Sequence, residues 1–334
     1  MVDTDQRFSS WSEYTVSRSA LVTGAYGFVG TSLCQLLAKG NWRLIAAHRR
    51  TVCPPTSVGT EQKYLPLSAE PQRWTESLRS IDCVVHLAAH VHQMGRDGTL
   101  DDNFDAINLE GSRFVAEQCA RAGVKRLVFL SSIKVNGEGS NHHAYSAEDP
   151  PYPQDAYARS KLSAEIAVRD VCEATGVEFV IIRSPLVYGP GVRANFRSLL
   201  KILTLGVPLP FGSINNRRSL VGVGNLVSFI ETCMTHPSAT GRVWLISDGE
   251  DVSTAGLVRK LSRLMQRPDR LFAFPPRWLR RLGKIAGLDA QMSRLCDSLM
   301  VDATPAYDRL NWRPRMSVDE GLALTVEAFK AERN

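Results

Sequence analysis

Three glycines separate a short apolar run from an amphipathic segment near the start of the chain. Residues 20–22 have the length of a buried strand, and Gly24, Gly27 and Gly30 lead into a segment whose leucines recur at helical spacing. Glycine allows a tight turn, a close backbone approach to a phosphate and close packing of helix on strand. The N–H groups at a helix start also attract anions. In this context the pattern G-x-x-G-x-x-G predicts a dinucleotide-binding unit.

The first half of the chain alternates apolar runs of strand length with amphipathic helices. The further runs are residues 43–47, 83–87, 126–130 and 178–183, and helices are expected near 29–39, 103–122 and 157–174. This alternation predicts an α/β fold, a doubly wound parallel (Rossmann) sheet with helices on both faces. A ligand is then expected beyond the carboxyl ends of the strands. Because glycine and proline become frequent after residue 185, we expect a Rossmann domain over 18–185 and a smaller C-terminal α/β substrate lobe over 186–330.

Tyr157 and Lys161 stand four residues apart on a predicted helix, so their side chains project from the same face. A free phenol titrates near ~10, and an adjacent ammonium stabilises the phenolate, which makes the phenol a usable acid or base nearer neutrality. Lowering a phenol pKa by about three units takes roughly 4 kcal/mol, so a second positive charge, such as an oxidised nicotinamide, is expected to help. Alone, the pair also fits a solvated surface tyrosine. Beside the glycine loop, the functional interpretation is favoured.

Composition narrows the classes of partner. The 334 residues carry a net charge of +6 with a pI of about 9.0. The arginines are spread out without the aromatic interleaving of a nucleic-acid site, and a diphosphate substrate with a phosphorylated cofactor explains the charge more simply. No apolar run reaches the ~18 residues of a membrane span, and the N-terminus lacks a signal peptide's apolar core. The seven cysteines are scattered, without C-x-x-C, which is typical of reduced thiols. We therefore expect a cytoplasmic protein.

Several motifs together resemble the extended short-chain dehydrogenase/reductase family, within it the NAD-dependent epimerase/dehydratase group that acts on nucleotide sugars. The resemblance extends from about Ala20 to Leu324 and implies that segments after residue 185 return to the main sheet. Its motifs are the glycine loop, Val85-His86-Leu87-Ala88-Ala89, Asn108 ahead of Gly111, Phe129-Leu130-Ser131-Ser132, the pair Tyr157 and Lys161, residues 183–191 and 217–226, and Asn311-Trp312-Arg313-Pro314.

The resemblance implies a role for each matched residue. Ser132, Tyr157 and Lys161 would be catalytic. Tyr157 would be the acid/base at the sugar C4 oxygen, and Ser132 would form a hydrogen bond to the same oxygen. Lys161 would lower the pKa of Tyr157 and also hold the nicotinamide ribose. Asn195 and Arg218 would contact the substrate diphosphate, with Leu209 and Phe211 along the uracil and Ser132 at the sugar. The cofactor would contact Gly24, Tyr26, Gly27, Phe28, Val29, Gly30, Leu87, Ala88, Ala89, Asn108, Ser131, Tyr157, Lys161, Pro185 and Val187.

The end of the second predicted strand bears on the choice of cofactor. NAD-binding folds usually place an acid about 20 residues after the glycine loop, to bind the ribose 2′-hydroxyl. This chain has His48-Arg49-Arg50 there, and no acid. Two arginines suit a 2′-phosphate through charge-assisted hydrogen bonds, although an exposed basic turn is the alternative. We therefore expect these three residues at the cofactor and favour NADP(H), with NAD(H) as the alternative.

The residues at positions 133 and 134 narrow the range of reactions expected of this chain. Dehydratases of the resembled family carry an Asp-Glu pair after the hydroxyl residue, whereas this chain has Ile133-Lys134, so 4,6-dehydration is not expected. The favoured hypothesis is hydride transfer at C4 by a UDP-4-keto-6-deoxy-N-acetylhexosamine 4-reductase. The alternative is a UDP-sugar 4-epimerase, of the UDP-glucose or UDP-N-acetylglucosamine type, with tightly bound NAD. A non-catalytic NADP-binding regulator is a third hypothesis, which the intact triad argues against. The resemblance also implies a homodimer.

Two other clusters receive structural interpretations. His86, His90 and His92 lack neighbouring carboxylate or thiolate ligands, so we expect satisfied polar histidines and no metal. Residues 278–288, with Arg280, Arg281 and Lys284, form a basic amphipathic stretch. For this stretch a solvated helix of the small lobe is favoured over a helix lying on a membrane surface.

Overall fold

Seven parallel strands form the main sheet of the computed structural model, which describes residues 18–40, 42–49, 60–90, 104–140 and 143–333. Their order across the sheet is β3-β2-β1-β4-β5-β6-β9. They span β1 (Arg18–Thr23), β2 (Trp42–His48), β3 (Thr60–Tyr64), β4 (Cys83–His86), β5 (Arg126–Ser132), β6 (Glu178–Ser184) and β9 (Arg242–Leu245). This sheet, with helices on both faces, confirms the predicted doubly wound α/β fold.

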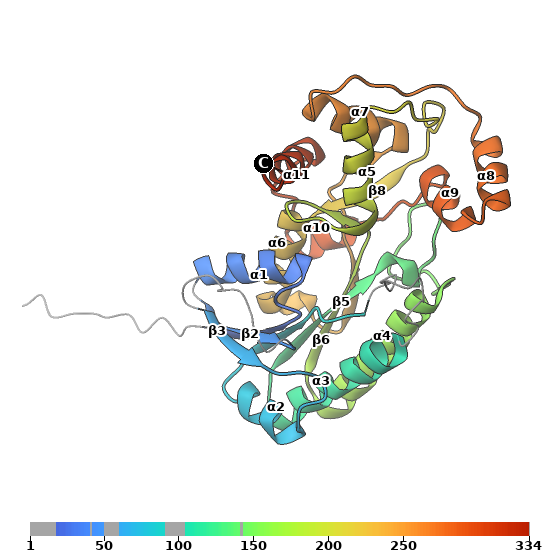
Figure 1. Cartoon of the computed structure of the whole chain (residues 1–334). Coiled ribbons are helices and arrows are strands. Elements are labelled where there is room, and N and C mark those ends of the chain that lie inside the picture. Colours follow the sequence, from blue (N-terminus) through green and yellow to red (C-terminus); the bar gives the residue numbers. More distant parts are fainter. Residues whose placement is uncertain (1–17, 41, 50–59, 91–103, 141–142, 334) are drawn as a thin grey trace, which may run out of the picture.

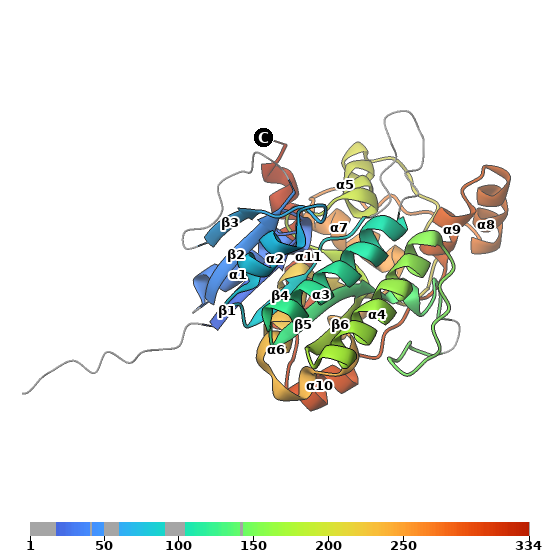
Figure 2. The same ribbon diagram turned by 90° about the horizontal axis from the view of Figure 1, so that it is seen from below.

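Helices cover both faces of this sheet (Figure 1). One layer holds α1 (Phe28–Lys39) and α6 (Val223–Thr235); the other holds α2 (Pro71–Leu78), α3 (Gly111–Ala122) and α4 (Ala156–Thr175). Figure 2, a view from below, shows α2, α3 and α4 lying across one face of the sheet. Because successive strand residues point to opposite faces, Ala20 and Val22 pack in the core under α1 and α6, while Leu21 packs in the core with Trp74. Burial on both faces explains why β1 is apolar from Ala20 to Val22.

The smaller lobe is built on a three-stranded sheet of order β10-β8-β7. Its strands are β7 (Leu186–Tyr188), β8 (Arg218–Gly222) and β10 (Asp251–Val252), and Tyr188, Phe196, Leu220 and Leu322 are buried in its core. The remaining helices are α5 (Ala194–Leu205), α7 (Thr254–Leu264), α8 (Pro276–Ile285), α9 (Asp289–Cys296), α10 (Thr304–Leu310) and α11 (Val318–Ala331). Among the described helices, none is long and apolar enough to cross a membrane.

Two elements from the second half of the chain join the main sheet. Strand β9 pairs with β6, and α6 packs with α1. A boundary at residue 185 therefore stays a prediction, because the segments on either side of it are interleaved in space.

The carboxyl ends of β1 and β4 lie side by side at the centre of the sheet. The chain leaves β1 toward β2 and β3 and then returns on the other side of β1 as β4. A doubly wound sheet opens a crevice at such a reversal, outside the carboxyl ends of its strands. The glycine loop follows β1 and Leu87-Ala88-Ala89 follows β4, so both predicted cofactor segments meet at this point.

Candidate active site

The glycine loop is pressed against the segment that follows β4. A Cβ on Gly24 would lie 2.8 Å from the Ala88 nitrogen, and one on Gly30 would lie 2.1 Å from the Gly24 oxygen. Gly24 also has φ +66°, a conformation that favours glycine. Thr23 Oγ1 accepts hydrogen bonds of 3.2 Å from the backbone N–H groups of Leu87 and Ala88. The two predicted cofactor segments are therefore locked together with no room for side chains between them.

The residues at this point of the sheet fit a dinucleotide cofactor in two respects. Gly27 is the N-cap of α1 and supplies no side-chain cap, so the first N–H groups of the helix, from Phe28 onward, are left for an anion. Ser131, near the end of β5, is 4% exposed, and its hydroxyl has no hydrogen-bond partner among the described residues. A buried unpaired hydroxyl costs free energy unless a ligand satisfies it. Pro185 is buried and Val187 is half-buried, just beyond the end of β6.

The residues at the end of β2, which were predicted to contact the cofactor, are less clearly arranged for that role. The His48 ring lies 5.6 Å from the Tyr26 ring and 6.0 Å from the Tyr64 ring, measured between centroids. Arg49 is exposed, and Arg50 lies outside the described residues. Of the two predicted arginines, only Arg49 lies among the described residues, just after the end of β2.

The three predicted catalytic residues come from β5 and the first turns of α4. Ser132 is the last residue of β5, and Tyr157 and Lys161 lie one turn apart on α4. Lys161 is 2% exposed, and its Nζ donates a 2.7 Å hydrogen bond to the Leu130 carbonyl, two residues before Ser132. Its ammonium also lies 4.0 Å from the centre of the Phe129 ring. These contacts hold the start of α4 against the end of β5.

The two titrating side chains of this group have strongly shifted pKa values. Burial lowers the pKa of Lys161 to about 7. Burial, and secondarily the charge of Asp155, raises the pKa of Tyr157 to about 12. In this structure burial outweighs any stabilisation of the Tyr157 phenolate by Lys161, whose Nζ donates to the Leu130 carbonyl. A second positive charge near the phenol is therefore needed to make it a base near neutrality.

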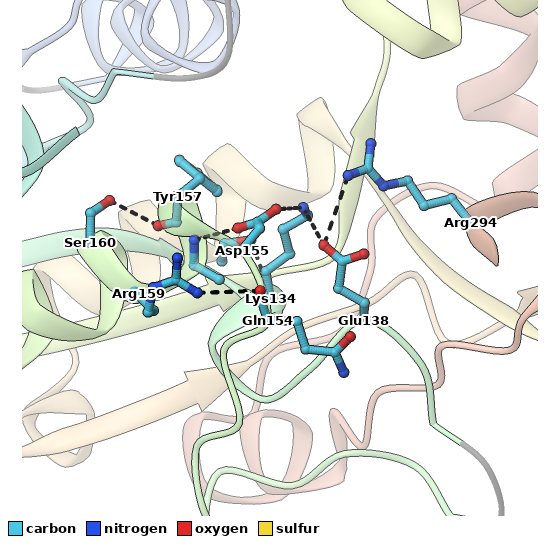
Figure 3. A network of polar contacts seen from close by, with 10 residues as sticks. Lys134, Glu138, Gln154, Asp155, Tyr157, Arg159, Ser160 and Arg294 are labelled. Atoms are coloured by element: carbon cyan, nitrogen blue, oxygen red, sulfur yellow. Dashed lines mark hydrogen bonds and ion pairs between the residues drawn. The ribbon is translucent and has the colours of Figure 1, made fainter. Parts of the chain in front are cut away.

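An ion-pair network surrounds the start of α4 (Figure 3). Asp155 is the N-cap of α4, and its carboxylate accepts a 2.7 Å hydrogen bond from the Ala158 N–H. Lys134 Nζ donates to Asp155 Oδ2 and, at 2.7 Å, to Glu138 Oε1, while its backbone N–H donates to Ser132 Oγ at 3.3 Å. Lys134 therefore joins the loop of one predicted catalytic residue to the helix cap beside another.

The sequence analysis used Lys134 only as evidence against 4,6-dehydration. It did not identify Asp155 or Glu138 as part of the site. An aspartate just before a predicted helix is a known capping signal and could have identified Asp155. The pairing with Lys134 spans 21 positions and depends on the packing of two elements, so no local pattern reveals it.

A buried polar chain runs from the glycine loop toward α3. Thr23 Oγ1 and His86 Nδ1 are 2.7 Å apart, and His86 Nε2 lies 3.1 Å from Ser112 Oγ. Burial, reinforced by the charge of Lys161, lowers the pKa of His86 to about 3, so the ring is neutral. His86 is thus a satisfied polar histidine. His92 lies outside the described residues, among which no group of three metal ligands gathers.

Asn108 continues this connection to α4, the helix that carries Tyr157 and Lys161. It is buried in a π-helical turn, η1 (Asp105–Glu110), where π-helical turns often mark functional sites. Its side chain accepts from the His90 N–H at 2.7 Å and donates to Ser160 Oγ at 3.0 Å. Ser160 in turn donates to the Tyr157 carbonyl at 2.9 Å (Figure 3). Asn108 therefore connects the segment after β4 to the backbone of Tyr157.

A buried ion pair fixes the same helix from its other side. Both carboxylate oxygens of Glu165, one turn beyond Lys161, accept from the Arg183 guanidinium, with a closest distance of 2.7 Å. Arg183 Nη1 also donates to Asn136 Oδ1 at 2.9 Å. Since a bidentate pair fixes orientation, this contact sets the rotation of α4 against β6.

Of the five predicted substrate residues, Ser132 ends β5 of the main sheet and the other four lie in the smaller lobe. Arg218, at the start of β8, donates from Nη1 to the carbonyls of Arg294 and Asp297, at 2.8 and 3.0 Å. Arg294 Nη2 approaches Glu138 Oε1 at 3.8 Å, so this lobe reaches the ion-pair network of the main sheet (Figure 3).

The other three predicted substrate residues are more scattered. Leu209 and Phe211 are half-buried on a segment that pairs with residues 270–272, where the Phe272 N–H donates to the Leu209 carbonyl at 3.1 Å. Asn195 is exposed in the first turn of α5. Of the four predicted substrate residues in this lobe, Arg218 alone is linked by hydrogen bonds and ion pairs to the start of α4.

Comparison with known proteins identifies the family. Residues 20–247 match the family model described as the NAD dependent epimerase/dehydratase family. The chain belongs to this family. This epimerase/dehydratase chain is 38% identical over 321 residues to a UDP-glucose 4-epimerase of Vibrio cholerae, covering 95% of this chain and 97% of that protein.

Two further proteins extend the comparison. An N-acetyl-alpha-D-glucosaminyl-diphospho-ditrans,octacis-undecaprenol 4-epimerase of Escherichia coli O157:H7 is 27% identical, covering 92% of this family member and 94% of that protein. The solved structure of MoeE5 in complex with UDP-glucuronic acid and NAD is 25% identical, with a TM-score of 0.74, covering 94% of this chain and 99% of that one.

Proposed function

We propose that this epimerase/dehydratase family member is a UDP-sugar 4-epimerase that retains NAD. The single observation that carries the proposal is the near-complete coverage of a UDP-glucose 4-epimerase at 38% identity. Ser132, Tyr157 and Lys161, at the start of α4 and the end of β5, suit an acid/base acting on a sugar hydroxyl. The favoured sequence hypothesis, a 4-ketoreductase, finds no such support, and the proposal adopts its alternative.

The two curated relatives differ in the carrier and agree in the reaction. Their names give 4-epimerisation in both cases, on a sugar attached to uridine diphosphate in one and to a polyprenol diphosphate in the other. The diphosphate is the chemistry they share. An arginine such as Arg218 suits that group, because its planar fork can bind a phosphate through two hydrogen bonds.

In the proposed reaction Tyr157 takes the proton from the C4 hydroxyl and later returns it to the C4 oxygen. Ser132 Oγ donates to the same oxygen and steadies it as its charge changes. The glycine loop, Ser131 and Lys161 would hold NAD, which would supply a reversible hydride acceptor for C4 of the sugar. Lys161 and the oxidised nicotinamide would together supply the positive charge that the Tyr157 phenol, with its pKa raised to about 12, requires.

We propose NAD(H) as the cofactor in place of NADP(H). MoeE5, an NAD complex, is similar to this chain over nearly its whole length, and nothing in the comparisons supports a preference for NADP. In this proposal Arg49, just after the end of β2, is a basic residue beside the adenosine ribose, and Arg50 lies outside the described residues.

The test combines the released nucleotide with a turnover assay. Purified protein, denatured with acid, should release NAD in about equal molar amount, and UDP-glucose or UDP-N-acetylglucosamine should be converted to its 4-epimer, followed by NMR. Tyr157→Phe should lower turnover at least ~100-fold, the usual scale for a positioned acid/base, and should still release NAD.

The opposite outcomes separate the hypotheses. An empty site with NADPH-dependent reduction of a 4-keto sugar would establish the reductase. Cofactor binding without turnover, or normal turnover in Tyr157→Phe, would overturn the catalytic assignment.

A further inference from the structure

Helix α8 exposes an apolar stripe that the fold does not use. Trp278, Leu282 and Ile285 are 46%, 53% and 78% exposed, and their spacing of four and three residues places them on one helix face. Leu288, just beyond the helix, is 44% exposed. Solvent-exposed apolar side chains in such a continuous row mark a surface that binds something.

A basic row runs beside this stripe. Arg277, Arg281 and Lys284 are all exposed. The sequence contains no Asp or Glu from residue 270 to residue 288. Arg280 alone of the helix's basic residues has an ion-pair partner among the described residues, Asp297. The surface is therefore apolar on one side and uniformly positive on the next.

The third side of α8 attaches it to the lobe. Leu279 is buried in a small cluster with Ile214 and Cys296, against which Phe211 also packs. Gly283 lies so close to α9 that a Cβ on it would be 2.2 Å from Met292 Cγ. The helix is thus firmly seated through one face, and it projects from the lobe with α9 (Figure 1).

We propose that α8 docks this protein on an anionic lipid surface. A helix with an apolar stripe beside Lys and Arg lies in the plane of the headgroup boundary, its apolar side chains among the acyl chains and its cations at anionic headgroups. Tryptophan is favoured at that depth. This reverses the sequence-based preference for a solvated helix, and it is independent of the proposed reaction.

The charge distribution argues against a second copy of the chain as the occupant. A twofold dimer would set this surface against itself, so the basic rows would meet without carboxylates in the stretch to neutralise them. An anionic membrane supplies the missing negative charge.

Docking would also orient the site. The helix that follows α8 leads directly to the Arg294 and Asp297 carbonyls that hold Arg218. The proposed diphosphate arginine would therefore lie one short helix away from the lipid surface.

The test is co-sedimentation of the full chain with phosphatidylcholine vesicles, with and without phosphatidylglycerol. The unmodified protein should bind the phosphatidylglycerol vesicles at low salt and detach at high salt, since screening weakens its charge contacts. Leu282→Ser with Ile285→Ser, which keeps the net charge, should weaken binding at least ~10-fold because two apolar side chains no longer insert. Leu324→Ser, at a 42% exposed leucine on α11, is the matched control and should bind like the parent.

Three results would overturn the proposal. The first is parent protein that stays in the supernatant with phosphatidylglycerol vesicles at low salt. The second is undiminished binding by the double variant. The third is a fall in oligomeric mass of the double variant in analytical ultracentrifugation, which would make α8 a subunit interface. Unchanged turnover of soluble UDP-sugar by both variants shows that they are folded, so docking is tested separately from the reaction.

Discussion

Asp155 stands in two relations to the proposed base. It caps the helix that carries Tyr157, and its negative charge contributes to the raised pKa of the Tyr157 phenol. Lys134 opposes the second effect, because its ammonium pairs with the Asp155 carboxylate. We therefore expect Lys134 to be a positioning residue, which acts on the reaction through Asp155 and does not contact the substrate.

Removing the Lys134 charge should slow the enzyme in a pH-dependent way. Lys134→Met leaves Asp155 unopposed, so the pKa of Tyr157 rises further and less phenolate is available at neutral pH. Turnover near pH 7 should fall about 10-fold, the effect of one pKa unit, and should recover as pH rises. The KM for the sugar nucleotide should be little changed. The measurement is the pH profile of kcat.

Two variants sharpen this test. Asp155→Asn in the Lys134→Met background should restore much of the neutral-pH rate, because asparagine still caps the helix without the charge. Lys260→Met removes a lysine that also pairs with two carboxylates, Glu250 and Asp319, on the smaller lobe, and should leave the profile unchanged. A pH profile of Lys134→Met that is lowered uniformly would indicate a structural role only.

At the scale of elements, the buried strands could be predicted from the sequence and the exposed edge strand could not. Strands β1, β4, β5 and β6 are apolar because both faces are covered, and their positions were predicted to within a few residues. Strand β3 was missed because it is an edge strand of sequence Thr-Glu-Gln-Lys-Tyr, with polar side chains in solvent.

The candidate site shows a similar division. The predicted triad and the glycine loop lie in short motifs, so they could be proposed from the sequence alone. The helix expected over 103–122 contains a π-helical turn in the structure, and the contacts of Asn108 with His90 and Ser160 that accompany it join three separate elements. Such contacts arise from packing, which no local spacing encodes.

Strand β8 begins with one arginine directed inward, while the arginine before it is exposed. Arg218 is partly buried against backbone carbonyls, whereas Arg217 has 68% of its side chain exposed and pairs with Asp251. Arg218→Ala should weaken UDP binding about 10- to 100-fold, as one charge-assisted pair is lost, with NAD retained. Arg217→Ala should bind UDP like the parent. Calorimetric titration with UDP checks both, and equal affinities of all three proteins would remove Arg218 from the site.

At the scale of the whole molecule, the neutral His86 links stability to pH. An unfolded histidine titrates near ~6.5, while burial holds the folded pKa at about 3. Below the unfolded value the unfolded chain binds a proton that the folded chain does not. The stability associated with neutral His86 is thus fully present above pH ~6.5 and is lost as pH falls toward the folded pKa.

The expected loss between about pH 7.5 and about pH 5 is at most about 2 kcal/mol from this one residue. This part of the stability loss should be absent in His86→Gln, because glutamine does not titrate and keeps a hydrogen-bond donor and acceptor. His143→Gln, at a histidine with 72% of its side chain exposed, is the control and should lose as much stability as the parent. Urea unfolding at both pH values measures these differences. An equal loss in His86→Gln and the parent would show that His86 does not carry the effect.

The place of β9 in the sheet has a consequence for how the chain matures on the ribosome. Until residues 242–245 are synthesised, the hydrogen-bonding edge of β6 has no neighbour on that side. An open apolar edge invites pairing with other nascent chains, and pairing across so long a separation is slow. The main sheet is therefore finished only after much of the smaller lobe has been made, and we do not expect the two to be separable as modules for transplantation.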